Sequence, residues 1–127
     1  MRPKVFIPQV TQRVIKRKGQ VLIDEGGSKI YEPAHDFTPA AKYGDLEVLI
    51  QHNKPVLLTV PIIRILRRKL QNFSDNDFII ATGDPSLMMI TAGVAAQMNR
   101  GRFTLLKWDR RASSYIPIIV DLNGDLS

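Results

Sequence analysis

The chain has 127 residues, a net charge of +6 and no cysteine. This length is enough for one domain with a core of its own. Without cysteine there is no disulfide, no thiolate metal site and no cysteine nucleophile, which fits a reducing compartment. Eighteen Lys and Arg residues stand against twelve Asp and Glu, and this balance favours anionic partners.

The N-terminus does not have the pattern of a secretory signal, because Pro8 interrupts a short apolar run. The longest stretch without a charge, residues 85–99, falls short of the roughly 20 apolar residues that a membrane-spanning helix needs. We therefore expect a cytoplasmic protein.

The first third of the chain predicts a basic arm. Residues 5–10 have the pattern of a strand, and Pro8 favours an edge position for it. Residues 12–15 and 20–23 flank a basic turn at residues 16–19, so we expect them to pair as a hairpin with a cationic tip. Residues 24–29 are typical of a flexible loop. The expected division is an arm or hairpin over residues 1–35 and a core domain over residues 36–127.

The core begins with short elements. Thr38 can cap a short helix that has Pro39 in its first turn and ends at Tyr43, before Gly44. Residues 46–50 and 56–59 predict two strands joined by a turn.

Residues 61–73 predict an amphipathic helix. Its apolar positions repeat with helical spacing on one side, at Ile62, Ile65, Leu66, Leu70 and Phe73. A polar stripe lies opposite, at Arg64, Arg67, Arg68 and Gln71. Lys69 falls near the margin of the apolar side, where its aliphatic stem can carry the charge outward.

A second helix follows a strand at residues 78–82. It starts at Pro85, runs to Met98 and contains no charge on any side. A helix that is apolar all round is normally covered all round, so its outer side needs either the arm or a second subunit. The candidate interface residues are Met88, Met89, Gly93 and Ala96.

Residues 102–108 and 115–122 predict two strands that pair as an antiparallel hairpin. The earlier alternation of strands and helices favours parallel pairing with right-handed crossovers. The sequence therefore predicts one small α/β domain, with a mixed and mostly parallel sheet, two main helices and a C-terminal antiparallel hairpin.

The turn between the strand at 78–82 and the second helix is a candidate ligand site, with Thr82, Gly83, Asp84 and Ser86 as its residues. Pro85 removes one amide donor, and the Asp84 carboxylate both caps the helix and repels a phosphate. A capped helix start is the favoured interpretation, and a ligand site is the alternative.

No catalytic set emerges. His35 and His52 are the only histidines, and they lack the spacing that closes a zinc site. The serines have no nucleophile motif around them. We predict no catalytic residue, no metal and no cofactor.

The basic residues form clusters that suggest anion binding. The clusters are Arg13, Lys16, Arg17 and Lys18; Arg64, Arg67 and Arg68; Arg100 and Arg102; and Lys107, Arg110 and Arg111. The last of these stands beside Trp108 and Tyr115, a combination suited to phosphate contact and base stacking. Each cluster can equally be a solvated surface, and Trp108 can be part of the core. The nucleic-acid interpretation gains if the clusters converge in space and fails if they scatter.

Three segments, residues 36–44, 83–85 and 105–111, together resemble a family of small tailed-bacteriophage proteins. The resemblance covers roughly residues 36–127, leaves the arm outside and transfers no catalytic residue. It implies a viral protein that acts in the bacterial cytoplasm.

The leading hypothesis is a non-enzymatic accessory module that self-associates and binds nucleic acid or an acidic host or viral protein. The alternative is a nucleotide or small-metabolite binder, or a weak enzyme, that uses the turn at residues 82–86. A purely structural assembly subunit is the third.

Overall fold

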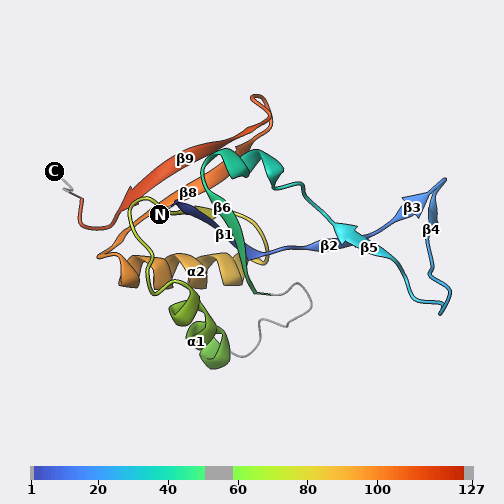
Figure 1. Cartoon of the computed structure of the whole chain (residues 1–127), viewed down its shortest axis with the longest axis horizontal. Coiled ribbons are helices and arrows are strands. Elements are labelled where there is room, and N and C mark those ends of the chain that lie inside the picture. Colours follow the sequence, from blue (N-terminus) through green and yellow to red (C-terminus); the bar gives the residue numbers. More distant parts are fainter. Residues whose placement is uncertain (1, 51–58, 125–127) are drawn as a thin grey trace.

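The structure of the chain, a computed structural model, describes residues 2–50 and 59–124. Its centre is a five-stranded sheet in the order β6-β1-β7-β8-β9 (Figure 1). The parallel strands are β6 (Asp45–Ile50), β1 (Lys4–Gln9), β7 (Phe78–Ile80) and β8 (Arg102–Asp109), and β9 (Ser114–Asp121) runs antiparallel to β8. The predicted fold class is confirmed: one small α/β domain with a mixed, mostly parallel sheet, two helices and a C-terminal hairpin.

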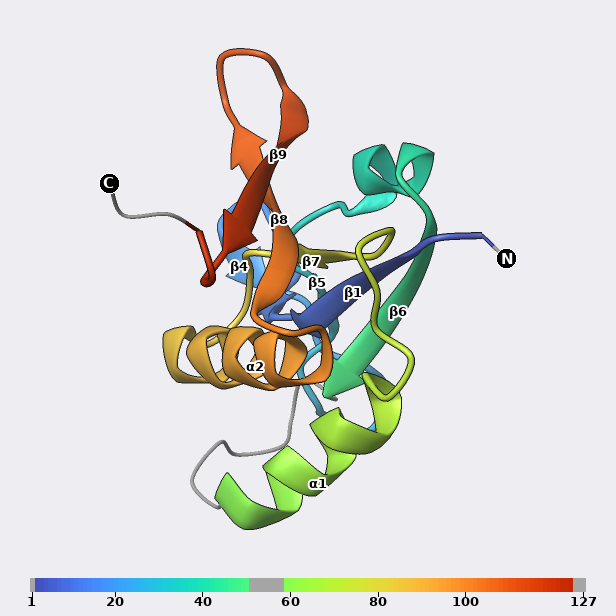
Figure 2. The same ribbon diagram turned by 90° about the vertical axis from the view of Figure 1, so that its left-hand side faces the viewer.

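Two helices cover one face of the sheet and a short 3-10 helix covers the other (Figure 2). α1 (Thr59–Lys69) and α2 (Pro85–Met98) pack on Phe6 and Ile79. On the opposite face, η1 (Thr38–Lys42) and the preceding Phe37 pack on a cluster that contains Ile7 and Leu106.

The amphipathic pattern of α1 is confirmed. Ile62, Leu66 and Leu70 are buried, and the arginine side chains are exposed. The helix ends at Lys69 and the chain continues in turns to Phe73, which is still buried and lies 5.9 Å from Phe6 between ring centroids. Lys69 bends back toward the sheet, and its Nζ donates to the carbonyl oxygens of Val48 and Leu49 on β6.

The predicted edge position of the first strand is wrong, because β1 lies between β6 and β7. Pro8 is accommodated because the pairing with β7 ends at Phe6 and none of the paired positions with β6 is Pro8. Its missing N–H therefore falls where the sheet requires no donor.

The part of the predicted arm that follows β1, residues 10–34, is called the arm from here on and projects from the sheet as a narrow two-stranded ribbon (Figure 1). β2 (Gln12–Val14) pairs with β5 (Tyr31–Pro33), and β3 (Lys16–Arg17) pairs with β4 (Gln20–Val21). The predicted basic turn is confirmed at Lys18 and Gly19, which have φ values of 52° and 77°.

The predicted pairing of residues 12–14 with the chain just after the turn is wrong. Asp24 Oδ1 accepts hydrogen bonds from the N–H groups of Gly26 and Ser28 and folds the following loop back. The returning strand β5 then pairs with β2, and the pairing brings Arg13 to Glu32 at 2.9 Å.

Thr38 does not cap η1, contrary to the prediction. The N-cap residue is Phe37, and Thr38 instead donates from both N and Oγ1 to Asp36 Oδ1, at 2.9 and 2.6 Å. The carboxylate two residues earlier takes over the role expected of the threonine.

The strand predicted at residues 56–59 is wrong at its last position, because Thr59 is the first residue of α1. Residues 56–58 and His52 lie outside the described residues.

The capped start of α2 is confirmed. Asp84 Oδ1 accepts from the N–H groups of Ser86 and Leu87, at 2.8 and 3.3 Å, with Pro85 in the first helical position. The expected coverage on all sides is not found in the described part of the chain. Met89 is 76 % exposed and Gly93 is also exposed, because the arm projects away from α2 (Figure 1).

Candidate functional site

The topology places a crevice where the chain changes direction in the sheet. From β1 the chain forms β6 on one side, and it then crosses through α1 to form β7 on the other side. In open α/β sheets, ligands bind at the carboxyl ends of the strands at such a switch point. Thr82 and Gly83 follow β7 at this edge. Gly83 has a φ of 98°, and a Cβ there would lie 3.2 Å from the Cβ and O of Gln9, so the turn requires glycine.

A cleft of about 440 Å³ opens at the same edge. Its wall comes from three separate segments: the root of the arm with the start of η1, the end of β7 and the β8–β9 hairpin. The lining residues are Ala34, His35, Asp36, Phe37, Pro39, Ile80, Ala81, Thr82, Trp108 and Tyr115.

Aromatic rings dominate this cleft. Trp108 and Tyr115 are paired across the hairpin, with ring centroids 5.0 Å apart and planes at 68°. Tyr115 is only 6 % exposed, whereas Trp108 is 41 % exposed and offers part of its ring to the cleft. His35 and Phe37 form a second tilted pair, at 6.2 Å.

One carboxylate shares the cleft with these rings. The two hydrogen bonds from Thr38, the side-chain bond first, lower the pKa of Asp36 below its ordinary value. Burial raises the pKa of Tyr115, and the negative charge of Asp36 raises it further. At neutral pH the cleft therefore holds an ionised carboxylate and a neutral phenol.

The predicted cluster of Lys107, Arg110 and Arg111 beside Trp108 does not lie on one face of the β8–β9 hairpin. In the β8–β9 register Trp108 faces Tyr115 and Lys107 faces Ile116, so Lys107 and Trp108 point to opposite faces. Arg110 and Arg111 are exposed in the turn that follows, which Asp109 Oδ1 shapes by accepting from the N–H of Arg111.

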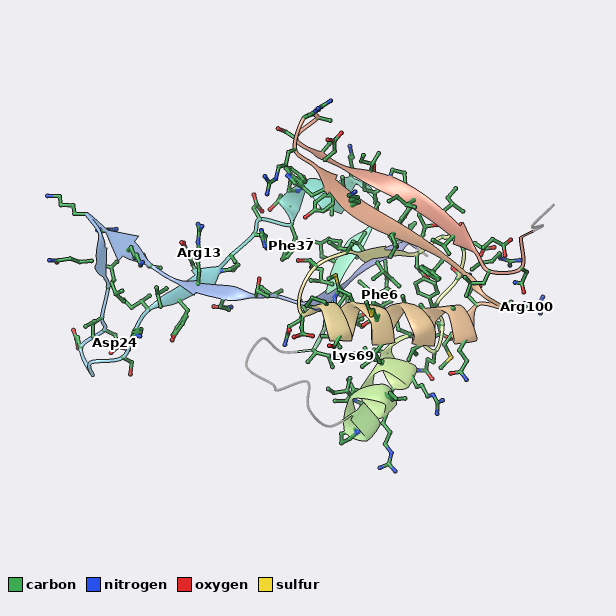
Figure 3. The ribbon with its side chains drawn as sticks, turned by 180° about the vertical axis from the view of Figure 1, so that it is seen from behind. Phe6, Arg13, Asp24, Phe37, Lys69 and Arg100 are labelled. Carbon is green, nitrogen blue, oxygen red and sulfur yellow. The ribbon has the colours of Figure 1, made fainter. Side chains whose placement is uncertain are left out.

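The arm cluster leaves from the same edge of the sheet. The arm begins directly after β1 and returns to the cleft at His35, and Figure 3 shows Arg13 on the ribbon and Phe37 between it and the hairpin. Lys16, Arg17 and Lys18 are exposed at the far end of the ribbon.

The stripe on α1 does not join the other two clusters. α1 lies on the opposite side of the molecule from the hairpin turn (Figure 2). Arg64 is exposed there, Arg67 Nη2 donates to Gln97 Oε1 of α2 at 3.3 Å, and Arg68 lines a second cavity, of about 550 Å³. Convergence of the basic clusters is thus not observed. The root of the arm and the hairpin border the cleft, but Lys16, Arg17 and Lys18 lie at the far end of the ribbon and the stripe lies on the other side of the molecule.

The remaining candidate residues occupy different places. Arg102 pairs with Asp75 at 3.1 Å, at the end of the sheet opposite the cleft. Of the predicted ligand turn, Thr82 lines the cleft, whereas Asp84 is engaged as the cap of α2. Of the four interface candidates, Met88 is half-buried, Met89 and Gly93 are exposed and Ala96 is buried within the chain.

Sequence reasoning missed the segment from His35 to Phe37 as part of the site and considered His35 only as a metal ligand. The signal was its position: an aromatic and acidic tripeptide stands where the chain returns from the arm, directly before η1. Among the described residues, no three His, Cys, Asp or Glu side chains gather as metal ligands would. No helix in the described ranges is long and apolar enough to cross a membrane.

The family described as Phage Pam3 gp32-like protein matches residues 3–122. The match includes β1 and the whole arm, so the expectation that the resemblance leaves the arm outside is wrong. No curated protein and no solved structure matches the chain. The chain belongs to the Phage Pam3 gp32-like protein family.

Proposed function

We propose that this phage protein is a non-enzymatic accessory module that binds single-stranded nucleic acid. One base stacks on Trp108 in the cleft, and the cations of the hairpin turn and the arm contact the phosphates. The observation that carries the proposal is the half-exposed Trp108, which forms a wall of a cleft with an arginine pair in the adjoining turn.

The aromatic lining supports stacking of a base. Stacking of one base on an aromatic side chain contributes about 1–3 kcal/mol, and any base can take part. The edge-on contact with the buried Tyr115 fixes the Trp108 ring without covering it fully. Trp108 is therefore held in place before a ligand arrives, which limits the entropy lost on binding.

The charges support a division between base and phosphate. The ionised Asp36 disfavours a phosphate inside the cleft, and its carboxylate can accept a hydrogen bond from an amino group of a base. Arg110 and Arg111 are exposed in the turn that follows Trp108, and from there they can contact the phosphates that flank a stacked base. The arm, with Lys16, Arg17 and Lys18 at its end, can extend the contact along the strand.

The fluorescence of Trp108, the only tryptophan, tests this proposal directly. Titration with single-stranded DNA and RNA of mixed sequence should change the emission at low salt, and the affinity should fall as salt rises. No binding at low salt, or an affinity indifferent to salt, contradicts the proposal.

Substitutions in the hairpin, with a matched control on α1, distinguish binding at the cleft from attraction to the net charge of the protein. In binding assays with a labelled oligonucleotide, Trp108→Ala should weaken binding by about 5- to 150-fold, the loss expected for one stacked base. The double change Arg110→Ala and Arg111→Ala should weaken binding and reduce the salt slope by about 1.4, or about 0.7 per phosphate contact. The control, Arg64→Ala with Arg68→Ala, removes the same charge from α1 and should have a much smaller effect. Equal effects of the two pairs would mean that only net charge matters.

A second candidate ligand is a nucleotide or small metabolite bound in the same cleft. The volume of the cleft favours this candidate, because it lies within the range of about 300–1,000 Å³ typical of ligand pockets. Thermal unfolding with a panel of nucleotides, with and without magnesium, tests it. A ligand at a hundred times its dissociation constant would add about 2.7 kcal/mol of stability. Stabilisation by a mononucleotide, without tighter binding of longer strands, would favour this candidate over the first.

A further inference from the structure

The last strand of the sheet has a free edge with an apolar surface. β9 carries no charge between Ser114 and Asp121. Ile119 is 82 % exposed, and Ile116, Ile118 and Leu122 are exposed as well. In Figure 2 β9 lies at the outer side of the hairpin. An exposed edge strand of this length normally carries charges that prevent pairing with another chain.

The hydrogen bonds identify which backbone groups of β9 face outward. Leu106 O accepts from the N–H of Ala81, so the backbone of Leu106 faces β7, and its partner Pro117 faces away from β8. Backbone N–H and C=O groups of successive residues point to opposite sides of a strand. The backbone groups of Tyr115, Ile119 and Asp121 therefore face outward, as those of Pro117 do.

Some of these outward groups already have partners. Tyr115 O accepts from the Tyr43 hydroxyl at 2.9 Å, and Asp121 O accepts from the N–H of Gly124 at 3.1 Å. Within the described residues no hydrogen bond reaches five other outward groups: Tyr115 N, Pro117 O, both N and O of Ile119, and Asp121 N.

We propose that two copies of the chain pair through β9, antiparallel, about a two-fold axis at Ile119. In this register the Ile119 N–H of each copy donates to Ile119 O of the other. The Asp121 N–H of each copy donates to Pro117 O of the other. Pro117 has no N–H to give, and the Asp121 O that would face it already accepts from Gly124. The four open groups from Pro117 to Asp121 of one strand therefore match those of a second copy. The remaining open donor, the Tyr115 N–H, lies opposite Asn123 of the other copy, whose backbone oxygen can accept from it.

The side chains match in the same register. Ile119 meets the partner's Ile119, Ile118 meets the partner's Val120, and Ile116 meets the partner's Leu122. Cross-strand pairs of branched apolar residues stabilise a sheet. The contact brings together the uncharged strands of two chains that each carry +6, so the pairing avoids the like charges that would oppose it elsewhere.

The opposite edge of the sheet is protected. On β6, Lys69 Nζ donates to two carbonyl oxygens, and the ion pairs Arg2–Asp45 and Lys4–Glu47 place charges along the strand. These are the features that block edge pairing. The sheet thus has one edge guarded by charges and one uncharged edge where Pro117 removes a single donor. The expected product is a closed dimer with a continuous ten-stranded sheet.

Cysteine cross-linking tests the proposed axis, because the natural chain has no cysteine. Residues directly opposite in a hydrogen-bonded antiparallel pair have Cα atoms about 5.5 Å apart, within the range that a disulfide spans. Ile119→Cys should therefore form a covalent dimer under mild oxidation. The control is Met89→Cys on the exposed side of α2, which should remain monomeric on a denaturing gel. Cross-linking through Met89→Cys and not through Ile119→Cys would overturn the proposal in favour of an α2 interface.

Sedimentation of the unmodified chain supplies the second test. A concentration-dependent dimer is expected, and Ile119→Pro should raise its dissociation constant by about 30-fold, the loss of two hydrogen bonds of typical net strength. The substitution leaves the inner ladder intact, because the Ile119 N–H faces outward as the position of Pro117 does. Ile119→Val retains the N–H and should dimerise normally. A strict monomer at all concentrations, or a series of larger species without a discrete dimer, would overturn the proposal whatever the result with nucleic acid.

Discussion

The carboxylate of Asp77 accepts a hydrogen bond from the backbone N–H of Lys4 at 2.9 Å, although 73 positions separate the two residues in the chain. Its other oxygen accepts from the N–H of Ser74 at 2.9 Å. Asp77 is 9 % exposed, so both bonds are largely protected from water. This side chain fastens the start of β1 to the turn before β7 and helps to hold β1 in the middle of the sheet.

Replacing Asp77 should therefore loosen the sheet at its amino end. Asp77→Ala leaves two backbone donors without their acceptor, and we expect it to lower the free energy of unfolding by about 2–3 kcal/mol. Urea denaturation measures the loss. Asp77→Asn keeps one side-chain oxygen as an acceptor and should lose less than Asp77→Ala. Equal stability of the natural chain and Asp77→Ala would show that the two bonds add nothing.

The bond between Lys4 and Asp77 also illustrates what the sequence could not reveal about the fold. The core helices and the β8–β9 hairpin were predictable, because the spacing of apolar residues in α1 and the Asp84-Pro85 cap of α2 act over a few residues. The position of β1 depends on contacts with β6 and β7, which come much later in the chain. Pro8 suggested that β1 is an edge strand. Its sequence context does not reveal that the pairing of β1 with β7 ends at Phe6, so that no N–H is required at position 8.

The candidate site was predictable only in separate pieces. Trp108 and Thr82 each stood out locally, but nothing in the sequence links them, because β7 and β8 meet only after α2 has crossed between them. His35 and Asp36 reach the same cleft because the arm returns to the edge from which it left. The pairing of β2 with β5 decides this return, whereas the sequence predicted that residues 12–15 pair with residues 20–23.

Alkaline pH should destabilise the protein through Tyr115. Its pKa is raised above the ordinary value of 10.0 by burial and by Asp36. The folded state therefore retains the phenolic proton more strongly than the unfolded state does. This contribution to stability is complete below pH 10 and is lost as the pH rises through the folded-state pKa.

Urea midpoints between pH 9 and pH 11 measure the Tyr115 effect. Tyr115→Phe should reduce the alkaline loss and keep the bond from the Tyr43 hydroxyl, which goes to the backbone oxygen. The emission of Trp108 should also fall as the phenolate forms, since the two ring centroids are 5.0 Å apart. An identical alkaline loss in Tyr115→Phe would assign it to other groups.

Acid should weaken the opposite end of the molecule through Asp75. Hydrogen bonds from Asn99 and Arg102 lower the pKa of Asp75 below the ordinary value of 3.8. A lowered folded-state pKa gives stability that is present above the unfolded value and is lost as the pH falls through the folded one. Asp75→Asn should therefore lose stability at pH 7 and show a smaller further loss at pH 3 than the natural chain. A parallel acid loss in both proteins would contradict this assignment.

Two glycines make a matched pair with opposite expected outcomes. A Cβ at Gly44 would lie 2.3 Å from the carbonyl oxygen of Pro3, so the strands β1 and β6 would have to separate. Gly44→Ala should destabilise the fold by about 3 kcal/mol, the upper range for an overpacked site.

At Gly93 in α2 a Cβ meets nothing within 4 Å, and alanine is the better helix former. Gly93→Ala should stabilise the fold by about 0.5–1 kcal/mol in urea denaturation, and its sedimentation should match that of the natural chain, because the proposed dimer leaves α2 free. A dimer weakened by Gly93→Ala alone would instead show that a second backbone approaches α2 at that glycine.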